Sequence, residues 1–192
     1  MISFAELCRP MIAMQVKDNK FISMNTLYPD IEQESPLWDA FPDAEAIAER
    51  ALQIAGNKLG DQFRDGAELS ILLSDDDHIR SVNQEWRGLD KPTNVLSFPA
   101  VESHKIATAS FLGDIIIAFE TVKREAESEH KDFADHFTHL VIHGFLHLLG
   151  YDHIDDADAE KMESLEIELL AELNIPNPYH DESSTIQDRA QS

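Results

Sequence analysis

The stretch HGFLHLLGYDH, residues 143–153, decides the local fold because it combines a helix, a turn and three possible metal ligands. On a helix, His143 and His147 lie one turn apart on the same face, so both imidazoles can reach one ion. Gly150 follows the last apolar residue, where a glycine can take positive φ and end the helix. The chain can then turn back and bring His153 to the same ion. Three neutral nitrogen ligands leave one position of a tetrahedral zinc open, which is typical of a catalytic site.

The spacing of these histidines matches that of metzincin proteases, H-E-x-x-H-x-x-G-x-x-H, except at one position. Gly144 stands where those enzymes carry the glutamate that acts as general base. Without that carboxylate, the group that activates water for peptide hydrolysis is missing from its expected place. The motif therefore predicts one zinc ion in a site adapted to other chemistry. The alternative is a helix with buried, hydrogen-bonded histidines, which explains three ligand-spaced histidines around a glycine less well.

The composition of the 192-residue chain fits one domain with appended tails. The single cysteine, Cys8, excludes an intramolecular disulfide and fits a reducing compartment. No apolar run approaches the ~18 residues needed to span a bilayer, and residues 1–20 lack the apolar core of a signal peptide. We expect a cytoplasmic protein with no membrane partner. Its predicted parts are an N-terminal extension (1–20), a catalytic domain (21–175) and a disordered tail (176–192).

The net charge of −22 argues against a general electrostatic attraction for nucleic acid. The acidic residues are unevenly placed, with nine acids and one base, Lys161, between Asp152 and Glu172. We expect this stretch to form a solvated helix face. An anionic substrate would therefore need a local basic patch together with the metal.

Hydrophobic periodicity predicts strands followed mainly by helices, an order typical of an α+β domain. We expect Ile79, Val82 and Trp86 on the apolar side of the second helix. The region 100–110 has the pattern of an irregular connection. The predicted strands lie within 21–31 and at 68–74, 95–99 and 112–119, and the predicted helices at 42–60, 74–86, 120–129, 133–149 and 156–173.

Two further residues near the motif are candidates for catalysis. His139 lies one helical turn before His143, but positions eight apart on a helix are about 12 Å apart along its axis. His139 is therefore predicted to line the cleft or to hydrogen-bond rather than share an ion with His147. Asp152 could orient a ligand or an activated water, or it could cap the turn, and both interpretations stay open. We expect His136 at the surface.

Arg87 is a further candidate, within the stretch QEWRGLDKPTNVLSFP, residues 84–99. A guanidinium suits phosphate oxygens and the charge that develops in phosphoryl transfer. Composition alone favours an ordinary surface charge. Its place just past a helix and before a shaped loop favours a functional role.

Three stretches, HGFLHLLGYDH, EWRGLDKPTNVLSFP and FLGDIIIA, resemble in order and spacing the YbeY family of endoribonucleases and ribosomal RNA maturation factors. The resemblance covers residues 24–173. It implies an α+β domain with a small mixed four-stranded sheet and about five helices, one of which carries the first two ligands. It also implies a zinc bound by His143, His147 and His153.

The resemblance assigns residue roles as well. It gives Arg87 a part in RNA cleavage and matches Asp114 to the aspartate of the family's LGD strand. Asn94 departs from the pattern, because many members have aspartate there. This departure removes a charge from the loop and leaves the ligands untouched.

We therefore predict a zinc-dependent, single-strand-specific endoribonuclease acting in ribosomal RNA maturation, including 16S 3′-end processing, and in ribosome quality control. Arg87 would neutralise phosphate charge in the transition state, and His139 or Asp152 could move protons. The expected partners are ribosomal RNA and ribosomal proteins or ribosome-associated factors, which would supply the affinity that an acidic chain lacks. Two alternatives are a metal-dependent hydrolase of another class, such as a peptidase, and a non-enzymatic assembly factor whose zinc only holds the fold.

Overall fold

A mixed four-stranded sheet forms the centre of the computed structural model, which describes residues 25–153 and 155–179. The predicted extension (1–20) lies outside these residues. The strand order is β1-β2-β4-β3, with three parallel strands and an antiparallel β3 at one edge. The strands are β1 (Leu27–Gln33), β2 (Ala67–Ser74), β3 (Val95–Pro99) and β4 (Phe111–Ala118).

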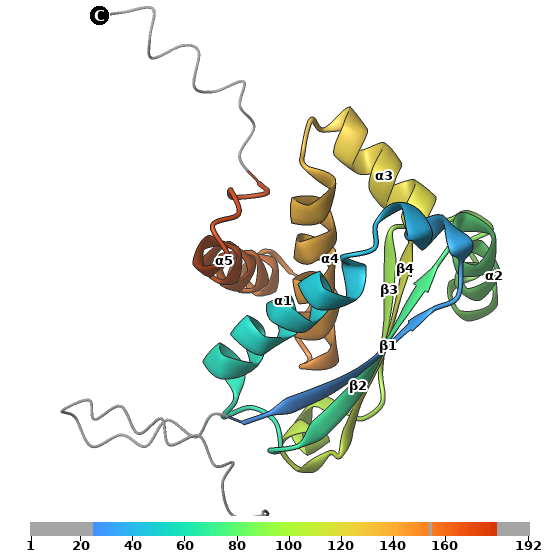
Figure 1. Cartoon of the computed structure of the whole chain (residues 1–192). Coiled ribbons are helices and arrows are strands. Elements are labelled where there is room, and N and C mark those ends of the chain that lie inside the picture. The colour runs from blue at the N-terminus through green and yellow to red at the C-terminus, as the bar shows by residue number, and fades with distance from the viewer. Residues whose placement is uncertain (1–24, 154, 180–192) are drawn as a thin grey trace, which may run out of the picture.

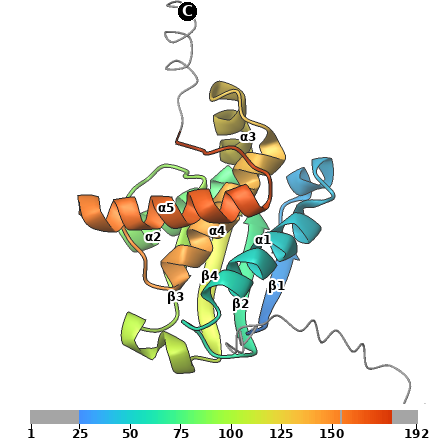
Figure 2. The ribbon, with the colours of Figure 1, turned by 90° about the vertical axis from the view of Figure 1, so that its left-hand side faces the viewer.

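Helices cover both faces of this sheet. Figures 1 and 2 show α1, α4 and α5 layered on one face and α2 alone on the other. The α-helices are α1 (Ala44–Leu59), α2 (Asp76–Arg87), α3 (Phe119–Ser128), α4 (Phe133–Leu148) and α5 (Asp156–Glu172), and the short 3-10 helices are Pro36–Ala40 and Ser103–Thr108. These elements confirm the predicted α+β fold with a mixed four-stranded sheet and about five helices. No helix in the described part is long and apolar enough to cross a bilayer.

The helix α4 is held between the sheet and the other helices by apolar side chains on several of its faces. Phe137 and Phe145 are fully buried, and the ring of Trp38 lies 5.2 Å from that of Phe137. Burying one such side chain contributes roughly 1.5–3 kcal/mol. The Trp38 indole N–H also donates to the carbonyl of Ser74 over 2.8 Å. This packing gives the histidines of α4 a rigid support.

Two sequence-based expectations on the fold need correction. The first strand runs from Leu27 to Gln33, later than the predicted 21–31, and residues 21–24 lie outside the described part. Trp86 is not on the buried side of α2, because its side chain is 70% exposed. Ile79 is fully buried and Val82 packs in the same cluster, as expected, while the ring of Trp86 lies edge-to-face with that of Phe98, with 5.8 Å between ring centres. The predicted irregular stretch 100–110 contains the 3-10 helix Ser103–Thr108.

Candidate metal centre and adjoining cleft

The structure brings the three predicted ligands, His143, His147 and His153, to one point. Each offers a nitrogen, and the three nitrogens lie within 4.8 Å of one another. Gly150 adopts φ +83°, as predicted, and ends the helix. Its N–H bonds to the carbonyl of His147, and the next N–H, of Tyr151, bonds to the carbonyl five residues back, as in a Schellman motif. This turn carries His153 back to the helix face, with its ring 5.2 Å from that of His143.

The two helical histidines have their protons fixed on the side away from the centre. His147 Nδ1 lies 2.9 Å from the carbonyl oxygen of Tyr151, which can only accept. His143 Nδ1 lies 2.8 Å from Oε1 of Glu166, a carboxylate. Both Nδ1 atoms therefore carry hydrogen, so in the neutral rings both Nε2 atoms present lone pairs. These two Nε2 atoms lie 3.1 Å apart. A metal ion between these nitrogens would use both lone pairs, and this donor set fits zinc.

The environment also keeps His147 neutral. Burial, together with the neighbouring His143 and His153, lowers the pKa of His147 to about 4. Metal binding requires neutral imidazole, so a low pKa keeps this ligand available at neutral pH.

A buried carboxylate, Glu166 on α5, completes the arrangement and was missed by the sequence-based prediction. Its side chain is 0% exposed, so Glu166 is the exception in an acidic stretch that otherwise forms the expected solvated helix face. Burial raises the pKa of Glu166, but hydrogen bonds from His139 and His143 outweigh it and lower the pKa to about 2. The sequence holds a signal for this position, because Glu166 shares helical spacing with the buried Met162 and Leu170.

His139 lies one helical turn from His143, with 6.1 Å between their ring centres, and shares Glu166 with it. Its Nε2 is 3.0 Å from Glu166 Oε2, the kind of hydrogen-bonding role predicted for it. It lines a cavity of about 460 Å³ next to the metal centre, together with His143 and His153. Arg87 does not line that cavity.

His136, expected at the surface, is buried with 6% of its area exposed. Its Nε2 lies 3.0 Å from the Glu125 carboxylate on α3. This contact between α3 and α4 gives one of the two ring nitrogens a partner in the interior, where a buried polar group needs one.

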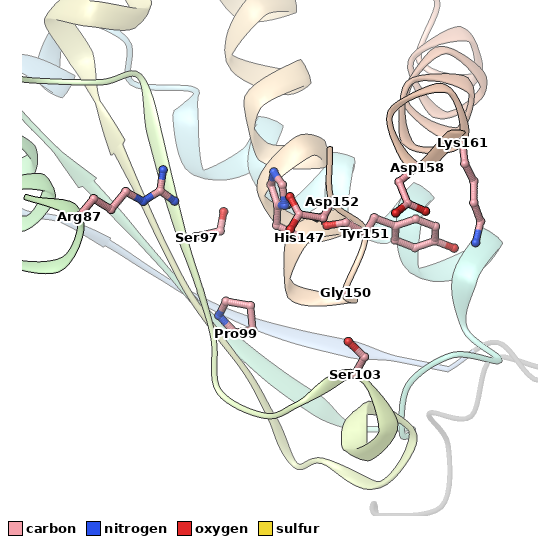
Figure 3. A pocket seen from close by; sticks show the side chains of 10 residues that line it. All are labelled: Arg87, Ser97, Pro99, Ser103, His147, Gly150, Tyr151, Asp152, Asp158 and Lys161. Carbon is pink, nitrogen blue, oxygen red and sulfur yellow. Dashed lines mark hydrogen bonds between the residues drawn. The ribbon is translucent and has the colours of Figure 1, made fainter. Parts of the chain in front are cut away.

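A cleft of about 490 Å³ opens on the other side of His147 (Figure 3). Arg87 points into it from the end of α2, toward Ser97 on the edge strand, and Lys161 lines it from α5 (Figure 3). Within the described residues, the Arg87 guanidinium makes no ion pair, whereas Arg80 is paired with Asp90. A guanidinium in the cleft that His147 also lines can bind a phosphate.

Two carboxylates share this cleft with the two cations. They are Asp152 and Asp158, so the formal charge of the four side chains is zero. Asp152 Oδ1 accepts a hydrogen bond from the backbone N–H of His153 over 2.8 Å, which supports the turn-capping interpretation. The carboxylate nevertheless faces the cleft beside His147 (Figure 3). Because the charges of these four side chains cancel, a bound divalent cation would make the local electrostatic potential positive.

The position that carries the metzincin base is tightly packed against the sheet. A β-carbon at Gly144 would lie 3.0 Å from Ile115 Cγ2 and 3.2 Å from Ser97 Oγ, so these side chains would have to shift to admit one. The glycine lets α4 approach the sheet closely. The absence of a carboxylate at this position weighs against peptidase chemistry.

The comparisons with known proteins agree with this geometry. A family model described as Endoribonuclease YbeY matches residues 31–174. The chain belongs to the YbeY family. A protein named Endoribonuclease YbeY from Bradyrhizobium diazoefficiens is 50% identical over 152 residues, covering 77% of this chain and 82% of its own. One of the same name from Azorhizobium caulinodans is 52% identical over 150 residues, covering 78% and 94%.

A solution structure from Thermotoga maritima also matches, with 26% identity and a TM-score of 0.45 over 81% of this chain and 97% of the other. Membership in the YbeY family confirms the predicted family and its enzyme class. The family match ends at residue 174, so Tyr179 lies beyond it. Asp114, on β4, is exposed and pairs in register with Phe98 of β3.

Proposed function

We propose that this chain is a zinc-dependent endoribonuclease that cuts single-stranded RNA, with one ion held by His143, His147 and His153. The observation that carries the proposal is the pair of Nε2 lone pairs 3.1 Å apart at a cleft that also contains an unpaired arginine. The name shared by the YbeY relatives supports RNA as the substrate. When bound, zinc supplies Lewis-acid stabilisation of phosphoryl charge and a more acidic water.

Arg87 would hold a phosphate in the cleft and neutralise the charge that grows on its oxygens during cleavage. A guanidinium can donate two parallel hydrogen bonds to a phosphate, which fixes orientation as well as charge. Lys161 lines the cleft from α5 and would contact the next phosphate along the strand as a point charge. A cleft of this size holds part of a flexible strand and cannot enclose a duplex, which supports single-strand preference.

Proton transfer is better assigned to Asp152 than to His139, the two candidates from the sequence. Asp152 lines the cleft with Arg87 and is exposed, so it can exchange protons with water. His139 donates to Glu166 and does not line this cleft. A general base must come within hydrogen-bond reach of the proton that it removes.

The cellular role that we propose is ribosomal RNA maturation, including 16S 3′-end processing, and ribosome quality control in the cytoplasm. The domain responsible spans residues 21–175. With a net charge of −22, the chain by itself should bind RNA weakly. Ribosomal proteins or ribosome-associated factors would therefore supply part of the affinity.

Cleavage assays on purified, zinc-loaded protein test this function. Single-stranded RNA, duplex RNA and casein are offered to the wild type, His147→Ala and Arg87→Glu, with circular dichroism as the check on folding. We expect cleavage of the single strand only, and loss of about 10²–10³-fold in Arg87→Glu, the usual cost of removing one transition-state donor. Proteolysis abolished by His147→Ala would instead establish the peptidase alternative.

The non-enzymatic alternative makes a different prediction. If zinc only holds the fold, His153→Ala should melt the domain, and Arg87→Glu should support growth as well as the wild type does. A folded Arg87→Glu protein that neither cleaves RNA nor supports ribosome maturation would exclude this alternative.

A further inference from the structure

Glu166 touches three other side chains that belong to two different parts of the chain. Its Oε1 accepts from His143 Nδ1 over 2.8 Å, and its Oε2 accepts from His139 Nε2 over 3.0 Å. The hydroxyl of Tyr179, from the segment after α5, donates to the same Oε2. From these contacts we infer that Glu166, clamped by His139 and Tyr179, positions His143 for the metal, so the C-terminal segment helps to build the metal centre. This inference rests on the proposed zinc site.

The carboxylate acts on His143 through its choice of tautomer. An ionised carboxylate can only accept, so it selects the form of His143 with hydrogen on Nδ1 and a lone pair on Nε2. In the other tautomer, hydrogen on Nε2 would point at His147 Nε2, which lies 3.1 Å away, and would block the ion. Carboxylate partners of this kind also make the imidazole a stronger ligand, and removing them typically weakens metal binding 10–100-fold.

Stability alone does not explain a carboxylate at this position. Met162, Leu169 and Leu170 surround Glu166 on the buried face of α5 and are each 0% exposed. A leucine at 166 would continue that apolar face, whereas a buried charge carries a desolvation penalty that its partners must offset. The three hydrogen-bond donors to Glu166 offset that penalty. In return, the carboxylate orients His143, a candidate metal ligand.

Tyr179 is held in place by its own local contacts. The Asn177 side-chain oxygen accepts from the Tyr179 backbone N–H over 2.9 Å, and Pro176 and Pro178 restrict the chain around it. The Tyr179 ring packs edge-on to His139 with 5.7 Å between ring centres. Residues 176–179, which we expected to begin a disordered tail, therefore reach back to the metal centre. Residues 180–192 lie outside the described part.

The same side chains suggest a competing possibility, a second ion. His139, His143 and Glu166 each offer a ligand atom, all within 4.8 Å. An ion there would need Nδ1 of His143 stripped of its hydrogen while Nε2 binds the first ion. The hydroxyl of Tyr179 donates to the carboxylate instead, which favours the positioning role. Metal analysis distinguishes the two: two zinc ions per chain, reduced to one in Glu166→Gln, would overturn the inference.

The direct test is the zinc dissociation constant of the full chain, measured by competition with a chromogenic chelator. We expect Glu166→Gln to bind zinc about 10–100-fold more weakly. Tyr179→Phe removes one donor at a partly exposed position and should weaken binding about 3–10-fold. Glu160→Gln, an exposed carboxylate on the same helix, is the matched control and should stay within about twofold, far below the 10–100-fold expected at the supported ligand.

A second readout reports the tautomer itself. Long-range nitrogen–proton NMR spectra of the metal-free protein should show His143 with hydrogen on Nδ1 in the wild type and a mixture of tautomers in Glu166→Gln. A merely structural role would lower thermal stability and leave both the tautomer and the zinc affinity unchanged. If Glu166→Gln does not fold, Tyr179→Phe decides.

The failure of this inference can be told apart from failure of the proposed function. If the wild type binds no zinc, both the proposed function and the positioning role of Glu166 are wrong. A wild type that binds zinc tightly, while folded Glu166→Gln and Tyr179→Phe bind it equally tightly, overturns the positioning role and leaves the zinc site standing.

Discussion

The side-chain amide of Asn94 donates a hydrogen bond to the Glu125 carboxylate, with 2.9 Å between Nδ2 and Oε2. The same oxygen lies 3.0 Å from Nε2 of the buried His136. Asn94 also accepts from the backbone N–H of Val95 over 2.7 Å. The loop before β3 is thereby tied to α3 and α4. The amide of Asn94 thus supplies a hydrogen-bond donor to the Glu125 carboxylate, which an aspartate at this position would not supply.

Asn94→Asp should therefore destabilise the fold. The substitution keeps the acceptor for Val95 but replaces the donor to Glu125 with a second carboxylate. We expect a loss of about 1–3 kcal/mol in the free energy of unfolding, the usual cost of removing one partner of a charged hydrogen bond. Urea denaturation at pH 7 measures it.

A double-mutant cycle isolates the cause. In the Glu125→Gln background, the carboxylate that would repel the new acid at position 94 is gone, so Asn94→Asp should cost less than it does alone. Equal costs in the two backgrounds would show that the Asn94–Glu125 contact does not set the stability of the loop.

The ligands and the helix were predictable from the sequence because their evidence is local. His143 and His147 are four residues apart, so helical geometry alone puts them on one face. The turn at Gly150 depends only on the positive φ of that residue. The prediction failed where burial depends on distant elements. Glu166 looks like the other acids of α5 until the packing of α4 against it is known.

His136 and Trp86 show the same limitation in opposite directions. A histidine in a polar stretch proved buried because Glu125, on another helix, supplies its partner. Trp86 has the helical spacing of a buried residue but proved exposed. It lies in the last turn of α2, where its ring meets Phe98 of the edge strand β3 and most of the side chain stays open to solvent. Periodicity reports which residues share a face but does not report how much of that face is covered.

The metal-free protein should lose stability as the pH falls from about 6.5 to about 4. Burial lowers the pKa of His147 from 6.5 to about 4. Above pH 6.5 neither state holds the proton, and between the two values only the unfolded state binds it, so unfolding becomes easier as the pH falls. The shift corresponds to at most about 3 kcal/mol.

Urea unfolding of the metal-free protein at pH 7, 6, 5 and 4 checks this dependence. His147→Gln removes the titrating ring and should flatten the curve across this window. The stabilisation from the ionised Glu166 carboxylate is fully present above its ordinary pKa of 4.5 and is lost as the pH falls from there toward its folded pKa of about 2, so it changes little between pH 7 and pH 4.5. A wild-type curve that stays parallel to that of His147→Gln from pH 7 to pH 4 would contradict the assignment.

Gly150 should tolerate alanine less well than Gly88 does, although both have positive φ. A β-carbon added at Gly88 would meet nothing within 4 Å, so Gly88→Ala should cost only the backbone penalty of about 1–2 kcal/mol. At Gly150 the added β-carbon would lie 2.6 Å from Ser103 Oγ and 3.1 Å from Ser103 Cβ. We expect an extra loss of about 1–3 kcal/mol from overpacking.

The Gly150 turn also places His153, so Gly150→Ala should weaken zinc binding while Gly88→Ala should not. Thermal denaturation gives the stabilities, and chelator competition gives the affinities. Equal stability losses at the two glycines, with unchanged zinc affinity, would mean that the turn relaxes without moving the third ligand.

Lys161 should contribute one phosphate contact to RNA binding, and the salt dependence of binding can count it. In the zinc-loaded protein, Lys161→Gln should lower the slope of log K against log salt by about 0.7–1. Lys123→Gln is the control, because Lys123 is an exposed lysine on α3 whose Nζ lies 3.9 Å from Glu127. Removing the metal should weaken RNA binding by the wild type and by both variants. Without the ion, the positive charges of Arg87 and Lys161 are cancelled by the negative charges of Asp152 and Asp158. A slope that is unchanged in Lys161→Gln but reduced in Lys123→Gln would place the RNA on another surface, because only a lysine that contacts phosphate releases counterions there.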